Sequence, residues 1–219
     1  VKSNLGHPDA AAGVAGLILM VYSYNILFLG TMFGFLGSAV LVISIILPKF
    51  TPTKDQNVLQ NITYGIKKFW IYSRLKGLLF LNIAIASGGS MIIVNTIIFV
   101  RSDLSLDEIA FPITMFAFGL GSMLAALYLP RLLERFTDKK LMISGCVIML
   151  LSFYILAIWI KLFGISWSAL IIIWITTGIG YSSVLTPIGR IIRKSSDGSD
   201  FSQLYAAQFS LSHACWLVM

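Results

Sequence analysis

Charged residues are scarce in this sequence, and they are missing altogether from its longest apolar segments. Asp, Glu, Lys and Arg make up 11% of the 219 residues, whereas 58% are hydrophobic, above the roughly 45–50% usual for soluble domains. Six segments lack all four charged types: 10–47, 78–100, 111–129, 141–160, 165–189 and 204–219. Because a soluble fold cannot cover so much apolar surface, the composition excludes a water-soluble globular protein and favours a membrane protein.

Cysteine is nearly absent as well. Cys146 and Cys215 both lie within apolar segments, where a thiol usually behaves as a small buried hydrophobe. The sequence therefore indicates neither a disulfide framework nor a metal site, and we expect no cofactor. Since no carboxylate lies in an apolar segment either, a carboxylate that couples protons to another process would have to lie elsewhere in the protein.

The apolar segments predict an all-α fold, a polytopic bundle of transmembrane helices. About 20 helical residues cross a hydrocarbon core of about 30 Å. The four central segments have this length, and residues 10–47 are long enough for two crossings that turn at residues 22–25. We therefore predict seven spans, and we expect both ends of the chain to be cut because it starts with Val1, without a signal peptide, and stops within an apolar run.

The basic residues predict the orientation of these spans. Three connections, 48–77, 130–140 and 190–203, hold thirteen of the sixteen Lys and Arg residues. The positive-inside rule places these three connections in the cytoplasm. The net charge of +7 therefore reports topology, and we expect membrane lipid but no nucleic acid among the partners.

The longest connection divides the chain into three parts: residues 1–47 with two spans, a cytoplasmic loop at 48–77, and residues 78–219 with five spans, the last truncated. Pro48 and Pro52 mark a linker. After it, apolar and polar residues alternate with helical spacing; the apolar ones are Val58, Leu59, Ile62, Ile66, Phe69 and Trp70. We predict a helix lying along the cytoplasmic membrane surface, with recruitment of a partner protein as the alternative.

Two apolar helices, a long basic connection and evenly spaced further helices resemble the join between the two six-helix halves of a major facilitator superfamily transporter. The resemblance implies that the segments correspond to the fifth through eleventh helices. Residues 130–140 are similar to the family's cytoplasmic signature Gly-x-x-x-Asp-Arg-x-Gly-Arg-Lys, with Pro130 and Thr137 replacing glycines and Asp138 replacing a base. This similarity implies gating roles for Glu134 and Arg135. The alternative is that the two residues form a solvated charge cluster at a helix end.

The resemblance also implies a function: secondary active transport of a small molecule by alternating access. Gly6-His7-Pro8, followed by Gly13 and Gly16, faintly resembles the fifth-helix signature of antiporters, although Pro8 can equally mark a helix start. We expect efflux by a monomer in the plasma membrane, here a bacterial inner membrane. Protons are candidate coupling ions, but the coupling ion stays open.

Polar side chains inside the predicted spans are candidates for substrate binding, because such groups are costly in lipid and tend to turn inward. The candidates are the following residues, each with a hydrogen-bonding side chain within an apolar segment: Asn82, Asn95, Tyr181, Tyr205, Gln208 and Ser212. Asn82 and Asn95 flank a predicted helix break at Gly88-Gly89-Ser90. His213 is the candidate for proton coupling. For each, an interhelical hydrogen bond that only fixes packing is the alternative.

Two other classes of protein remain as alternatives. An integral-membrane enzyme needs nucleophiles, acids or metal ligands gathered at one place, and the sequence shows no such spacing: His7 and His213 lie at opposite ends of the chain. A non-transporting scaffold or sensor could use the same fold. We therefore predict a transporter that is not an enzyme.

Overall fold

The structure, a computed structural model, describes residues 24–44, 58–196 and 200–219, and these contain helices but no strand. The helices are α2 (Tyr24–Ser44), α3 (Val58–Ile71), α4 (Ser73–Ile97), the π-helix η1 (Ile98–Asp103), α5 (Ala110–Arg135), α6 (Asp138–Phe163), α7 (Trp167–Leu185), α8 (Ile188–Ser195) and α9 (Phe201–Val218). The predicted all-α fold is confirmed. The predicted first span, the signature at residues 6–16 and the linker at 48–55 lie outside the described residues.

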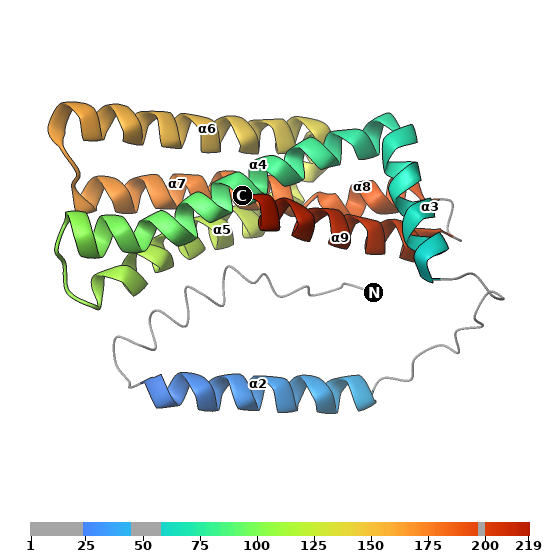
Figure 1. Ribbon diagram of the computed structural model, residues 1–219, viewed down its shortest axis with the longest axis horizontal. Coiled ribbons are helices and arrows are strands. Elements are labelled where there is room, and N and C mark those ends of the chain that lie inside the picture. The colour runs from blue at the N-terminus through green and yellow to red at the C-terminus, as the bar shows by residue number, and fades with distance from the viewer. Residues whose placement is uncertain (1–23, 45–57, 197–199) are drawn as a thin grey trace.

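Four described helical segments are long and apolar enough to cross a membrane: Ser73–Asp103, Ala110–Arg135, Asp138–Phe163 and Trp167–Ser195. They run alongside α9 as one bundle (Figure 1). The start of α4, the turn between α5 and α6, and α8 all lie at one end, which we call the basic end because three basic connections meet there. This end is the one that the charge distribution predicts to be cytoplasmic.

Helix α7 lies at the centre of the bundle and packs against α5 and α6. Its Leu170 and Trp174 are fully buried. A Cβ atom added at Gly145 of α6 would lie 2.6 Å from the carbonyl oxygen of Gly180 in α7, so the two backbones approach too closely for any side chain there. In lipid, such close contact between helices replaces the hydrophobic drive that assembles soluble proteins.

Helix α4 is continuous where the sequence predicts a break, so that prediction is wrong. Gly88 and Gly89 lie inside the helix, and the space beside them is filled by the side chains of Met149 and Trp216. A glycine inside a helix costs only about 1 kcal/mol relative to alanine. The close packing that these two glycines permit offsets that cost, so α4 remains regular from Ser73 to Ile97.

The helix that follows the predicted linker is α3, which lies crosswise to α4 at the basic end (Figure 1). The sequence suggests that the apolar face of this helix rests on the membrane surface. In the structure, part of that face packs against the protein. Phe69 is fully buried, and a Cβ at Gly65 would lie 2.7 Å from the carbonyl oxygen of Gln203. Helix α3 is therefore docked on α4 and on the start of α9.

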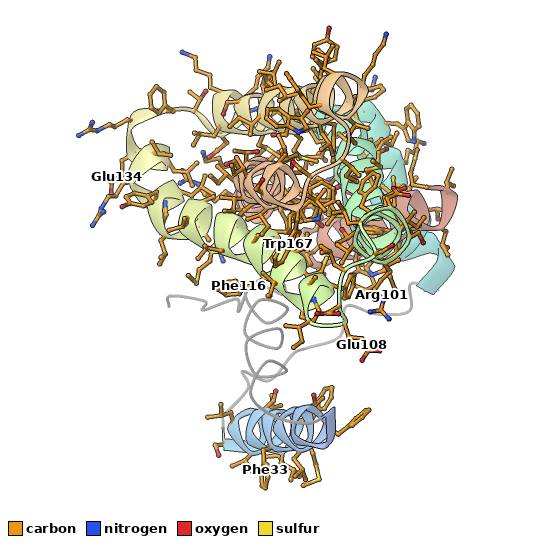
Figure 2. The ribbon with its side chains drawn as sticks, turned by 90° about the vertical axis from the view of Figure 1, so that its left-hand side faces the viewer. Phe33, Arg101, Glu108, Phe116, Glu134 and Trp167 are labelled. Carbon is orange, nitrogen blue, oxygen red and sulfur yellow. The ribbon has the colours of Figure 1, made fainter. Side chains whose placement is uncertain are left out.

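From Phe28 to Ser44, helix α2 contributes no buried side chain to this core. Its residues from Phe28 to Ser44 are all exposed, and it lies apart from the bundle in both views, with Phe33 on its surface (Figures 1 and 2). The contacts described below therefore belong to the bundle from α3 to α9.

Candidate functional site

A pair of buried amides joins α4 to α9. Gln208 Nε2 donates a hydrogen bond to Asn82 Oδ1 at 2.8 Å, and Asn82 Nδ2 donates one to Gln208 Oε1 at 3.2 Å. Only 3% of Asn82 and 7% of Gln208 is exposed. The structure thus brings together two predicted site residues, whose hydrogen bonds hold α4 against α9. Because both amides are buried, a solute reaches them only if α4 and α9 move.

The exposed face of α9 is polar and aromatic. Its exposed residues from Ser202 to Ala214 are Ser202, Tyr205, Ala206, Phe209, Ser210, His213 and Ala214. His213 comes twelve residues after the start of the helix, about 18 Å along its axis at 1.5 Å per residue. It therefore lies in the second half of α9, away from the basic end at which the helix starts.

The exposed face of α6 has a different composition. Val147, Leu150, Leu151 and Ile155 are each about half exposed or more, and they form the apolar surface that hydrocarbon requires. Polar groups placed in hydrocarbon are costly and tend to face the protein interior or a water-filled cavity. We infer that the exposed face of α9, unlike that of α6, does not face lipid.

The geometry of His213 assigns its tautomer. The ring nitrogen Nδ1 lies 2.8 Å from the backbone carbonyl oxygen of Phe209, and the rings of His213 and Phe209 are tilted by 35° with centroids 4.0 Å apart. A carbonyl only accepts hydrogen bonds, so Nδ1 carries the hydrogen. In the neutral ring, Nε2 is then the nitrogen that can accept a proton or a hydrogen bond from a solute.

The other candidate residues are dispersed. Tyr181 is buried, with its ring edge-on to Phe118 of α5 at 5.5 Å, and half-buried Asn95 points its amide at the sulfur of Met91 one turn earlier. Ser212 donates to the carbonyl of Phe209 on its own helix at 2.9 Å. The candidates on α9 do not share one face, because Gln208 faces α4 while Tyr205 is exposed beside Phe201.

Two interhelical hydrogen bonds involve residues that sequence reasoning missed. Trp174 Nε1 donates to Thr96 Oγ1 at 2.8 Å, and Trp167 Nε1 donates to Thr114 Oγ1 at 2.9 Å. An indole N–H buried within a bundle usually finds an acceptor. The tryptophans in the sequence thus indicated that hydrogen-bond acceptors lie on neighbouring helices. Their spacing could not identify which threonine accepts each bond.

At the basic end, Asp138 connects α6 to α8. Its carboxylate pairs with Arg190 Nε at 3.4 Å and with Lys194 Nζ, and the Asp138 side chain is only 11% exposed. Asp138 also lies in the first turn of α6, where the helix dipole favours negative charge. Asp138, one of the three residues that depart from the family's signature, therefore joins the two helices.

Glu134 and Arg135, the predicted gating pair, are both exposed. They end α5, and Glu134 points away from the bundle in Figure 2. Neither forms an ion pair within the part of the chain that the structure describes. Their arrangement is that of solvated charges at a helix end, where an ion pair contributes only about 0–1 kcal/mol.

A second ion pair joins α3 to α9. Lys68 of α3 donates to the carboxylate of Asp200, with side-chain exposures of 15% and 6%. The hydrogen bond to Asp200 raises the pKa of Lys68 well above its usual range. Tyr64 and Tyr72 flank the ammonium group, with ring centroids 4.9 and 5.8 Å away. The sequence did not identify Asp200 as the partner of Lys68, because the two residues are 132 positions apart.

Among the residues described, no three His, Cys, Asp or Glu side chains are grouped so that they could hold a metal ion. The arrangement combines apolar membrane-spanning helices with polar groups inside the spans and ion pairs near the helix ends. These features define an integral membrane protein built as an all-α helix bundle.

Comparison with known families identifies the bundle. The family model of the Major Facilitator Superfamily matches residues 78–215, more than half of the chain, and the chain therefore belongs to this superfamily of transporters. The match covers all of α5 to α8 and most of α4 and α9. No curated protein and no solved structure matches the chain.

Proposed function

We propose that the protein is a secondary active transporter that exports a small organic molecule by alternating access, and that the exposed face of α9 forms part of the solute path. One observation carries this proposal: Tyr205, Ser210 and His213 are exposed on a helix that the family match includes. Polar groups at this depth are stable when they face a water-filled path. The buried Asn82–Gln208 pair lies beside that path and fixes α9 against α4.

The roles within the path differ. The aromatic rings of Tyr205 and Phe209 offer stacking surfaces to a flat or lipophilic solute. His213 offers Nε2 as a proton acceptor, which makes it the candidate for coupling transport to protons. Ser212, Asn95 and Tyr181 remain candidates only for a state in which the helices have moved, since each now contacts protein.

Opening and closing at the basic end is assigned to Asp138 with Arg190 and Lys194, in place of the Glu134–Arg135 pair. The pairing of Asp138 with two bases joins the start of α6 to α8. A change of state that separates α6 from α8 must break both contacts. Such a network contributes more than an isolated exposed pair, so its loss shifts the balance between the two states.

The experiment that tests this function is substrate-dependent proton movement in vesicles that contain the full-length protein, across a panel of lipophilic cations and metabolites. We expect a signal in the wild type that His213→Ala abolishes and that Gln208→Ala reduces. Tyr154→Ala, on the exposed face of α6, is the matched control and should leave the signal unchanged. Transport unaltered in both α9 variants would contradict the proposed path.

A further inference from the structure

The corner where α3 meets α4 concentrates positive charge. The sequence from residue 56 to residue 102 contains no Asp or Glu, and its four bases before Arg101 lie close together: Lys67, Lys68, Arg74 and Lys76. Lys68 is neutralised by Asp200. Lys67, Arg74 and Lys76 are exposed, and none of them pairs with an acid anywhere in the ranges described. Three positive charges at this corner therefore have no counter-charge from the bundle.

Three consecutive apolar side chains are exposed at the same corner. Trp70 is 62% exposed, Ile71 61% and Tyr72 42%. Trp70 and Ile71 end α3, which runs crosswise at the basic end, and Tyr72 joins it to α4, which enters the bundle (Figure 1). Trp and Tyr are enriched at the membrane–water interface because their rings have an apolar body and a polar group. The corner therefore lies at the boundary between headgroups and hydrocarbon.

The corner is also held rigidly. Phe69 is buried, Gly65 contacts the backbone of Gln203, and the Lys68–Asp200 pair fixes the helix between them. Because α3 is already docked on α4 and α9, little ordering is required when a ligand binds its outer face. A preformed arrangement of this kind binds more tightly than a mobile basic segment.

We propose that Lys67, Arg74 and Lys76, with Trp70, Ile71 and Tyr72, form a site for the headgroup of an anionic phospholipid in the adjacent leaflet. The three cations bind the negatively charged phosphate, and the exposed apolar side chains pack against the upper part of the acyl chains. The site is independent of which solute the protein carries, since none of its residues lies on the exposed face of α9.

The turn between α5 and α6 provides a matched comparison. It also carries exposed bases at the basic end, among them Arg131, Lys139 and Lys140, but Glu134 and Asp138 lie among them. If the number of exposed basic residues alone determined the attraction of anionic lipid, the two regions would bind it alike. If the arrangement at the α3–α4 corner matters, that corner binds more tightly.

The test titrates phosphatidylglycerol into the full-length protein in a neutral detergent and counts bound lipids by native mass spectrometry. Each basic residue near an anionic surface contributes a factor of about five in binding. The variant Lys67→Gln/Arg74→Gln/Lys76→Gln should therefore bind phosphatidylglycerol about a hundredfold more weakly. The control Arg131→Gln/Lys139→Gln/Lys140→Gln should bind phosphatidylglycerol within about twofold of the wild type. The charge-conserving variant Lys67→Arg/Lys76→Arg should retain binding, which serves as a check on folding.

Three outcomes would overturn the proposal: equal loss of binding in the two triple variants, undiminished binding in the first triple variant, or wild-type binding of phosphatidylcholine as tight as that of phosphatidylglycerol. The first would mean that total positive charge alone attracts the lipid. The second would assign the corner to another partner, such as an acidic protein segment. The third would mean that acyl-chain contacts dominate.

Discussion

Helices α6 and α9 belong to the same bundle, and both have exposed faces, but those faces are suited to different surroundings. Between Ile143 and Trp159, α6 exposes mainly branched aliphatic and aromatic side chains. Between Ser202 and Ala214, α9 exposes two serines, a tyrosine and a histidine among three apolar residues. Exposure in a membrane protein therefore does not reveal which medium a face contacts. The composition of the exposed face does, because hydrocarbon penalises polar groups and water does not.

The largest expected effect comes from placing a charge on each face at the same distance along the helix. Val147 and Ser210 are both exposed, and each lies nine residues after the start of its helix. A lysine near the middle of a lipid-facing span costs about 3 kcal/mol. Val147→Lys should therefore prevent accumulation of folded protein in the membrane, as measured by fluorescence-detected size-exclusion chromatography.

On α9 the same substitution should be tolerated for folding. Ser210→Lys places its ammonium group in the proposed water-filled path, so the amount of folded protein should match the wild type while transport is lost. If Ser210→Lys were depleted from the membrane as severely as Val147→Lys, the difference between the two faces would be refuted.

Replacing one member of the buried amide pair should have the next largest effect. Asn82→Leu leaves the amide of Gln208 buried without its partner, which costs about 1–3 kcal/mol, and Gln208→Leu should cost a similar amount. The double variant removes both polar groups and should be more stable than either single variant. Thermal unfolding in detergent measures all three, and strictly additive destabilisation would show that the two amides do not act as a unit.

The basic end should show a smaller effect, confined to transport. Asp138→Asn removes the charge that pairs with Arg190 and Lys194 and should change the transport rate several-fold by shifting the balance between states. Glu134→Gln is its matched control, because Glu134 is an exposed acid four residues earlier without an ion pair among the described side chains. A larger effect from Glu134→Gln would restore the gating role predicted from the resemblance.

The smallest effect concerns pH. Since Asp200 raises the pKa of Lys68, the pair contributes stability that is complete below the lysine pKa of the unfolded chain and is lost only as pH rises through the folded-state value. The stability difference between the wild type and Lys68→Met should therefore stay constant from about pH 6 to 9 and shrink above about pH 10.4. Lys67→Met, an exposed control, should show little difference at any pH. A Lys68→Met difference that changed near neutral pH would contradict the ion pair.

Much of the fold could be predicted from the sequence, because hydrocarbon imposes strict rules on length and charge. The positions of α4 to α7, though not their limits, follow from charge-free segments such as 78–100 and 141–160. The predicted break at Gly88 failed because the glycines accommodate Met149 and Trp216 from other helices. The docking of α3 was also missed, since an amphipathic pattern does not distinguish a membrane surface from a protein surface.

Less of the candidate site could be predicted. The sequence identified Asn82, Gln208 and His213 as polar residues within spans, but it could not pair Asn82 with Gln208 across 126 residues. It chose Glu134 and Arg135 at the basic end because they fit the family's signature. Asp138 was noted only as a departure from that signature, although its position in the first turn of α6 brings it to Arg190 and Lys194. Partners of this kind depend on helix packing, which sequence spacing alone does not specify.

The most direct test of the difference between α6 and α9 is labelling by a water-soluble maleimide in membranes that contain the full-length protein. Cys146 and Cys215 are first replaced by alanine, and a single cysteine is then introduced by Ser210→Cys or Val147→Cys. We predict rapid labelling at position 210, because that face of α9 contacts water, and no labelling at position 147, because that face of α6 contacts lipid. Protection of both positions, or equal labelling of both, would contradict the account.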